Sequence, residues 1–149
     1  MWNYEKKLQY PVKIKNPNPA LAGVIISQLG GPDGELAAAT RYLNQRFSMP
    51  DRKVAGILTD IGSEELAHME MIGAILYQLT RNIDPDKLVD TPFATYFVDH
   101  TTGVYPASAA GVPFDAKYLG VKGDAIADLN EDLAADAAIL QEQPLSKNR

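Results

Sequence analysis

The fold is decided by the stretch Asp60-Ile61-Gly62-Ser63-Glu64-Glu65-Leu66-Ala67-His68-Met69-Glu70. It lies within residues 51–80, whose apolar residues recur in steps of three and four: Val54, Leu58, Ile61, Ile72, Ile75, Leu76 and Leu79. This spacing predicts one long helix with a single buried face. Continued from Ile61, the same steps reach Glu65 and His68, so a carboxylate and an imidazole interrupt an otherwise aliphatic stripe.

Burying a carboxylate is costly unless the group is paired or bound to a metal. Glu65 and His68 are three positions apart, so on a helix their side chains point the same way and can reach one ion. One interpretation is a core pair that is hydrogen-bonded to other helices, and the other is a pair of metal ligands. Because the two residues break an aliphatic stripe, we favour the metal site.

The composition narrows the class of protein. The chain has 149 residues, the size of one domain, and its 46% of apolar residues suffice for a core. A net charge of −5 argues against nucleic-acid binding. The lack of cysteine excludes disulfides, thiolate metal sites and cysteine nucleophiles. The sequence shows neither a secretory signal nor an apolar run of about 18 residues, so we expect a soluble intracellular protein.

The rest of the chain is arranged around the long helix in one domain. We expect an N-terminal arm over residues 1–19, a helical hairpin over 20–80, a crossover loop over 81–122, a third helix over 123–140 and a polar tail over 141–149. Proline and glycine turn sequences mark the crossover loop. The short turn Ser48-Met49-Pro50-Asp51 predicts that the helices on either side of it are antiparallel.

A second candidate ligand follows a glycine-rich run. Gly30-Gly31-Pro32-Asp33-Gly34 should break the first helical pattern, which resumes at Glu35. The resumed segment has an apolar stripe of Leu36, Ala39, Leu43 and Phe47. Glu35 lies one position off this stripe, where it is either a favourable charge near a helix N-terminus or a metal ligand. The neighbouring alanines leave room for a compact group beside it.

The third helix is predicted by the spacing of Ile126, Leu129, Leu133 and Leu140. One further step from Leu133 reaches Asp136 or Ala137, so Asp136 is a third acidic residue that can face inward. The alternative is a solvated face, because Asp128, Glu131 and Asp132 lie nearby. His100, in the crossover loop, is interpreted as a loop histidine.

These stretches resemble the non-haem manganese catalases, and most closely the small bacterial members associated with the spore coat. The segments that carry the resemblance are residues 30–38, 42–45, 60–70 and 123–135, together with parts of the crossover loop. The resemblance implies a mainly α, ferritin-like four-helix bundle. It also implies a dimanganese site that disproportionates hydrogen peroxide to water and oxygen.

The ligand roles are likewise implied by the resemblance. Glu35 would bridge both metals, and Glu65 and His68 would ligate one of them. The second metal would take a glutamate from the third helix, where this sequence has Asp136, and a histidine from a fourth helix. That helix is missing here, so we expect an incomplete bundle in a chain that is C-terminally truncated relative to the family.

Three functions are compatible with this reading. The first is a manganese catalase-like enzyme acting on hydrogen peroxide, impaired if the second half-site is lost. The second is a structural or assembly protein of the spore coat with a vestigial metal site, and the third is a ferritin-like iron-binding protein. We expect manganese, in two, one or no copies, with iron as the alternative. We also expect a homo-oligomer or an assembly with other coat proteins, located in the cytoplasm or the spore coat.

Overall fold

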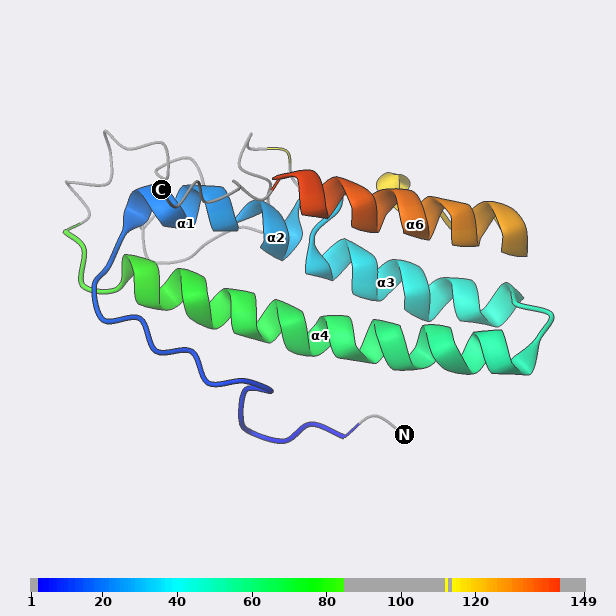
Figure 1. Cartoon of the computed structure of the whole chain (residues 1–149), viewed down its shortest axis with the longest axis horizontal. Helices are drawn as coiled ribbons and strands as arrows, with labels where there is room; N and C mark the ends of the chain where they lie inside the picture. Colours follow the sequence, from blue (N-terminus) through cyan, green and yellow to red (C-terminus); the bar gives the residue numbers. More distant parts are fainter. Residues whose placement is uncertain (1–2, 85–111, 113, 143–149) are drawn as a thin grey trace, which may run out of the picture.

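The computed structural model describes residues 3–84, 112 and 114–142. In this part of the chain the regular structure is helical, without strands. The helices are α1 (Pro19–Ile25), α2 (Ser27–Gly30), α3 (Glu35–Gln45), α4 (Arg52–Thr80) and α6 (Ala125–Glu142), with 3-10 turns at Arg46–Ser48 and Ala116–Tyr118 (Figure 1).

Helices α1, α2 and α3 follow one another along the length of α4, so that α3 and α4 form an antiparallel hairpin (Figure 1). The helix starts follow from local chemistry. The Asn18 side chain accepts a hydrogen bond from the backbone N–H of Leu21 and caps α1, whose first residue is Pro19. Asp51 caps α4 in the same way. Side-chain caps thus define the starts of α1 and α4, whereas α3 starts after Gly34 without one.

Two apolar clusters hold the hairpin together. One joins α1 to the C-terminal part of α4, and the other joins α3 to its N-terminal part. The buried members are Ala22, Ile26, Leu76 and Leu79 in the first cluster, and Ala38, Tyr42, Met49 and Leu58 in the second. Ala125 and Leu129 of α6 pack against the second cluster. The apolar attachment of α6 therefore lies near its N-terminal end.

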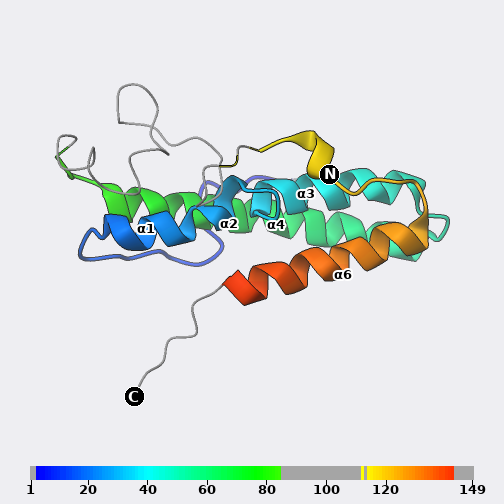
Figure 2. The same cartoon turned by 90° about the horizontal axis from the view of Figure 1, so that it is seen from above.

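Helix α6 runs antiparallel to α3 and diverges from the hairpin toward its own C-terminal end (Figure 2). Its start is defined by two aspartates. Asp124 accepts hydrogen bonds from the backbone N–H groups of Ile126 and Ala127. Asp128, which is fully buried, accepts from the backbone of Lys122 and Gly123. The loop that leads into α6 is therefore bonded to the helix itself.

The predicted apolar face of α6 was wrong at Ile126 and Leu133, whereas Leu129 of the same stripe packs against the second cluster. Ile126 and Leu133 are 76% and 71% exposed, whereas Asp128 and Asp132 are buried. The reason is that these carboxylates have hydrogen-bond partners in the protein, so the helix turns its acidic face inward. Phe47 is also exposed, contrary to the stripe predicted for α3, and its ring lies 4.6 Å from the Arg46 guanidinium.

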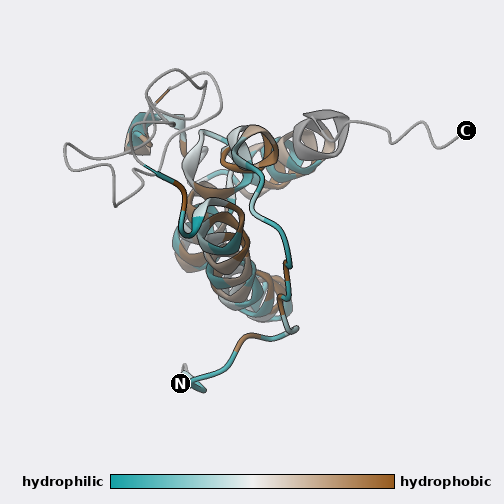
Figure 3. Ribbon diagram, turned by 90° about the vertical axis from the view of Figure 1, so that its left-hand side faces the viewer, coloured by the Kyte–Doolittle hydropathy of each residue, from teal (hydrophilic) through white to brown (hydrophobic). Residues whose placement is uncertain are grey.

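The N-terminal arm lies along the outside of α4, as the end-on view in Figure 3 shows. Polar side chains hold it there. The Tyr4 hydroxyl donates to Glu70 over 2.7 Å, and the Gln78 side chain bonds the backbone of Val12 and Ile14. No helix in the described ranges is both long and apolar enough to cross a bilayer. His100 lies outside the described residues.

Candidate metal centre

The position of Glu35 depends on the glycine immediately before it. Glu35 is the first residue of α3, and Gly34 is the N-cap position. A Cβ at Gly34 would lie 2.8 Å from the carbonyl oxygen of Ser27 and 2.9 Å from the backbone nitrogen of Gly30. Both are main-chain atoms, so a side chain at Gly34 would force the turn open. Glycine thus lets α3 start close to α2 and sets the place of Glu35.

Glu65 and His68 lie near the middle of α4, on the face that α3 covers. A second glycine allows this contact to be close. A Cβ at Gly62 would lie 2.8 Å from Leu43 Cγ and 3.1 Å from Tyr42 Cβ. The absence of a side chain at Gly62 therefore brings the two helices together one turn before the candidate ligands.

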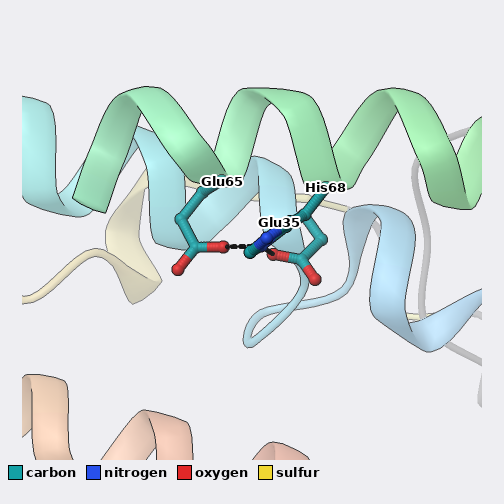
Figure 4. A group of neighbouring side chains, drawn as sticks. All are labelled: Glu35, Glu65 and His68. Carbon is teal, nitrogen blue, oxygen red and sulfur yellow. Dashed lines mark hydrogen bonds and ion pairs between the residues drawn. The ribbon is translucent and has the colours of Figure 1, made fainter. Parts of the chain in front are cut away.

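The three predicted ligands of the hairpin converge (Figure 4). Glu35, Glu65 and His68 each offer one ligand atom, and these atoms all lie within 4.8 Å of one another. His68 Nδ1 is 2.7 Å from Glu65 Oε2 and 3.8 Å from Glu35 Oε2. One imidazole nitrogen thus faces two carboxylates from two helices. The spacing in the sequence predicts that Glu65 and His68 lie close together on α4. The packing of α3 against α4 brings Glu35 to the same place.

The electrostatics of this group favour a cation. The side chains of Glu35 and Glu65 are 16% exposed, and that of His68 is 35% exposed. Burial raises the pKa of Glu35 to about 8, and the hydrogen bond and negative charge of Glu65 and the charge of Asp136 add to the rise. Two partly buried carboxylates with an imidazole are a donor set that suits manganese or iron. The residues present therefore fit the metal that the resemblance implies.

Asp136 lies outside this three-residue group. It is exposed, and its Oδ1 accepts a hydrogen bond of 3.0 Å from the Tyr42 hydroxyl. The carboxylate is nevertheless near enough to contribute to the raised pKa of Glu35. Among the predicted site residues, the structure thus groups those of the hairpin and holds Asp136 beside them through a tyrosine.

Tyr42 is a residue that the sequence reasoning missed. It is buried, and burial, followed by the charge and hydrogen bond of Asp136, raises the pKa of its hydroxyl. It lies seven positions after Glu35, which places both residues on one face of α3. That spacing was the available signal. The signal is weak, because a tyrosine at this spacing fits a helix core as well as it fits a site.

Comparison with known proteins shows which proteins this chain is similar to. A family model described as manganese containing catalase matches residues 1–143. Protein CotJC of Bacillus subtilis is 56% identical over 136 residues, which cover 91% of this chain and 71% of CotJC. A probable manganese catalase of Clostridium acetobutylicum is 33% identical over 138 residues, covering 91% of this chain and 61% of that protein.

Solved structures agree as well. The crystal structure of KatB, a manganese catalase from Anabaena, superimposes with a TM-score of 0.84 at 32% identity, covering 95% of this chain and 63% of KatB. The chain therefore spans less than two thirds of the two catalases named here. The predicted fold class, a mainly α, ferritin-like bundle, is confirmed, and the described residues contain part of that bundle. On the match of the family model and the identity to its relatives, the chain belongs to the manganese-containing catalase family.

Proposed function

We propose that this chain forms part of a dimanganese centre that disproportionates hydrogen peroxide to water and oxygen. The observation that carries the proposal is the convergence of Glu35, Glu65 and His68 within 4.8 Å, in a chain of the manganese catalase family. Two carboxylates and an imidazole on a rigid hairpin are pre-organised for a divalent metal, because both helices that hold them are packed.

The proposed roles follow from where the side chains lie. Glu35 comes from a different helix than Glu65 and His68, and the charge of Asp136 contributes to its raised pKa. As the family resemblance implies, Glu35 would be the carboxylate shared by two ions. Glu65 and His68 would hold the first ion. Asp136 is the candidate of α6 for the second ion, and a partner subunit or a further segment would supply the remaining ligands.

Bound manganese would supply the one-electron changes, two ions together accounting for the two electrons of each peroxide. The chain's own residues bind and orient. Glu35 and Glu65 balance the charge of the ions and are shielded from water. The His68 side chain is the most exposed of the three, so a small substrate reaches the group from this side. Tyr42 holds the Asp136 carboxylate in one orientation.

A second candidate function is a structural protein of the spore coat whose metal site contributes stability. It is supported by the 56% identity to CotJC. In this reading the half-site binds one ion or none, and the partners are further copies of the chain or other coat proteins. An iron-binding, ferritin-like protein is the third candidate, since iron accepts the same ligands.

The deciding experiment is elemental analysis of the native protein together with oxygen evolution from hydrogen peroxide. About two manganese ions per chain with oxygen release support the enzyme. One ion or none, without oxygen, supports the coat protein, and co-purified iron supports the third candidate.

Matched variants test the ligand assignment. Glu65→Gln and His68→Gln should each lose most of the bound metal, because a ligand is replaced by a weaker or longer donor. Glu70→Gln is the control, since Glu70 lies on the same helix but bonds Tyr4 of the arm. Equal metal content in all three variants would withdraw the assignment.

A further inference from the structure

Helix α6 presents an aspartate at every fourth position, and each of these carboxylates has a different partner. Asp124 bonds the first N–H groups of the helix, Asp128 bonds the backbone of the preceding loop, Asp132 accepts from Gln45 of α3, and Asp136 accepts from Tyr42 of α3. The contact between α3 and α6 is thus largely polar. Its aspartates recur once per turn, although the ion pair of Arg41 with Glu131, at 3.6 Å, lies outside this repeat.

A periodic acidic face does not by itself specify one register. If α6 slid along its axis by four residues, about 6 Å, and turned by about 40°, each aspartate would take the place of its neighbour. For the slip that brings Asp132 to Tyr42 and Asp128 to Gln45, both α3 side chains would again face carboxylates, whereas the opposite slip would bring Leu140 to Tyr42. Hydrogen bonds to aspartate alone therefore do not distinguish the observed position of Asp136 from one displaced by a turn.

Apolar packing constrains the register only at one end. Ala125 and Leu129 pack against the core of the hairpin. Leu133, one turn further, is 71% exposed, and Ala135 contributes only a methyl group to the interior. Toward Asp136, then, α6 lacks a large apolar side chain inserted into the hairpin within the described residues.

Gln45 breaks the periodicity through a hydrogen bond to the loop that precedes α6. Its side chain is fully buried, and its amide nitrogen donates both to Asp132 Oδ1 over 2.9 Å and to the carbonyl oxygen of Gly120 over 2.7 Å. Both amide hydrogens are used. Gly120 belongs to the loop before α6 and occurs once, unlike the repeated aspartates. Only one register lets Gln45 bond both acceptors.

The loop can act as this reference because it is bonded to the helix. Asp128 holds the backbone N–H groups of Lys122 and Gly123. Gly120 also lies directly against the side chain of Glu131, whose carboxylate occupies the place of a Cβ at Gly120. Loop and helix therefore move together, and a side chain that bonds both acceptors fixes the position of the whole unit.

We propose that Gln45 is a positioning residue that selects the register of α6 and thereby places Asp136 opposite Tyr42 at the metal centre. Gln45 touches none of the candidate ligands and acts through Asp132 and the loop. The structural part of this inference is independent of the metal. Its consequence for metal binding rests on the proposed function.

The register can be measured directly on the metal-free full chain. The protein has no cysteine, so Tyr77→Cys and Ile126→Cys introduce a single pair of spin labels. Both positions are exposed, one near the C-terminal end of α4 and the other at the start of α6. The line between the two labels runs mainly along the helix axes. A slip of α6 along its axis therefore changes the distance between the labels by nearly the length of the slip.

In this background Gln45→Met removes both donors and keeps the length of the side chain. Asn44→Met is the matched control, because Asn44 is the neighbouring residue and its exposed side chain bonds only Thr40 of its own helix. We expect one narrow distance in the parent and in the Asn44→Met chain. Gln45→Met should give a broad or double distribution with a component displaced by about 6 Å.

A second pair of variants approaches the contact from α6. Asp132→Asn keeps an acceptor for Gln45 and should retain the narrow distance, whereas Asp132→Leu should behave like Gln45→Met. If Gln45→Met loses its helical circular dichroism and so does not fold, the two Asp132 variants still test whether this contact selects the register of α6. For manganese, we expect about a tenfold loss of affinity in Gln45→Met and none in Asn44→Met.

A single parent-like distance in both Gln45→Met and Asp132→Leu would overturn the inference. A displaced distance in a protein whose parent binds no manganese supports the register role and refutes only the proposed function. Parent-like distances with weakened manganese binding in Gln45→Met would refute selection of the register, because the affinity would then depend on something else.

Discussion

The two interfaces of α3 are built by opposite means. Against α4, the helix packs through alanines, the Tyr42 ring and the space left by Gly62. Against α6, it offers Arg41, Gln45 and the Tyr42 hydroxyl to carboxylates. The first interface carries the three grouped candidate ligands, and the second carries Asp136 alone.

This difference teaches how the two halves of the site are held. Apolar packing is non-directional, and it stabilises in proportion to the area that it removes from water. Hydrogen bonds contribute less net stability but depend on geometry. The hairpin side should therefore govern whether the protein folds, and the α6 side should govern where Asp136 lies.

The largest effect should come from the hairpin core. Leu58→Ala removes a side chain that is 2% exposed and packs near Ala38 and Tyr42, so the free energy of unfolding should fall by about 2–5 kcal/mol. Leu133→Ala on α6, 71% exposed, should change it by less than about 0.5 kcal/mol. Urea unfolding of both variants measures the contrast. Equal losses would show that α6 also depends on apolar burial.

The close approach of α3 and α4 can be tested with an added methyl group. Gly62→Ala places a Cβ 2.8 Å from Leu43 Cγ, so the helices must separate at a cost of about 1–3 kcal/mol. Gly56→Ala is the matched control on the same helix. No described atom lies within 4 Å of its Cβ, so the better helix propensity of alanine should stabilise by about 0.5–1 kcal/mol. A destabilised Gly56→Ala chain would point to an unseen neighbour.

The α6 interface should respond to pH. Burial raises the pKa of Asp132 to about 6, with smaller contributions of the same sign from Glu131 and Asp136, against the opposing effects of Gln45 and Arg41. The folded state thus holds this proton more tightly than the unfolded state. The contribution of Asp132 to the free energy of unfolding is fully present below about pH 4, near its ordinary pKa. It is lost as the pH rises through 6, the pKa in the folded state, and the free energy of unfolding falls by up to about 3 kcal/mol.

This decline is best measured on the metal-free Glu35→Gln variant, since the raised pKa of Glu35 causes a separate loss of stability up to about pH 8. Adding Asp132→Asn should flatten the unfolding free energy between pH 4 and 6. An unchanged slope in the double variant would place the responsible group elsewhere.

The smallest effect is expected when the N-cap side chain of α4 or of α6 is removed. Asp51→Ala and Asp124→Ala each remove the side-chain acceptor at a helix N-terminus, at a cost of about 1 kcal/mol. Because α6 has less packing to support its start, amide exchange should accelerate over more residues after Asp124→Ala than after Asp51→Ala. The reverse order would mean that α6 is held more firmly than its contacts indicate.

The hairpin could be predicted from the sequence because its signals are local. The stripe through Leu58, Ile61 and Leu76 marks the inner face of α4, and the glycine run marks the start of α3. The spacing of Glu65 and His68 is fixed by the helix itself. The fold class came from the resemblance to a known family, and the comparisons confirmed it.

The α6 interface could not be predicted in the same way. The apolar spacing of Ile126 and Leu133 indicates the wrong face, and nothing in the local sequence indicates that Asp132 is buried. Which face turns inward depends on Gln45 and Arg41, some 90 positions earlier, and on the loop that brings Gly120 to them. Periodicity describes one helix at a time and contains no information about such distant partners.

The hairpin origin of the three candidate ligands has a consequence for folding and synthesis. Glu35, Glu65 and His68 all lie within one local supersecondary unit, and contacts of short sequence separation form early. A growing chain completes this unit before α6 has been synthesised, because domains are made from the N-terminus onward. If the hairpin binds an ion as proposed, the nascent hairpin would bind it first, and α6 would then dock onto a half-site that already carries its positive charge.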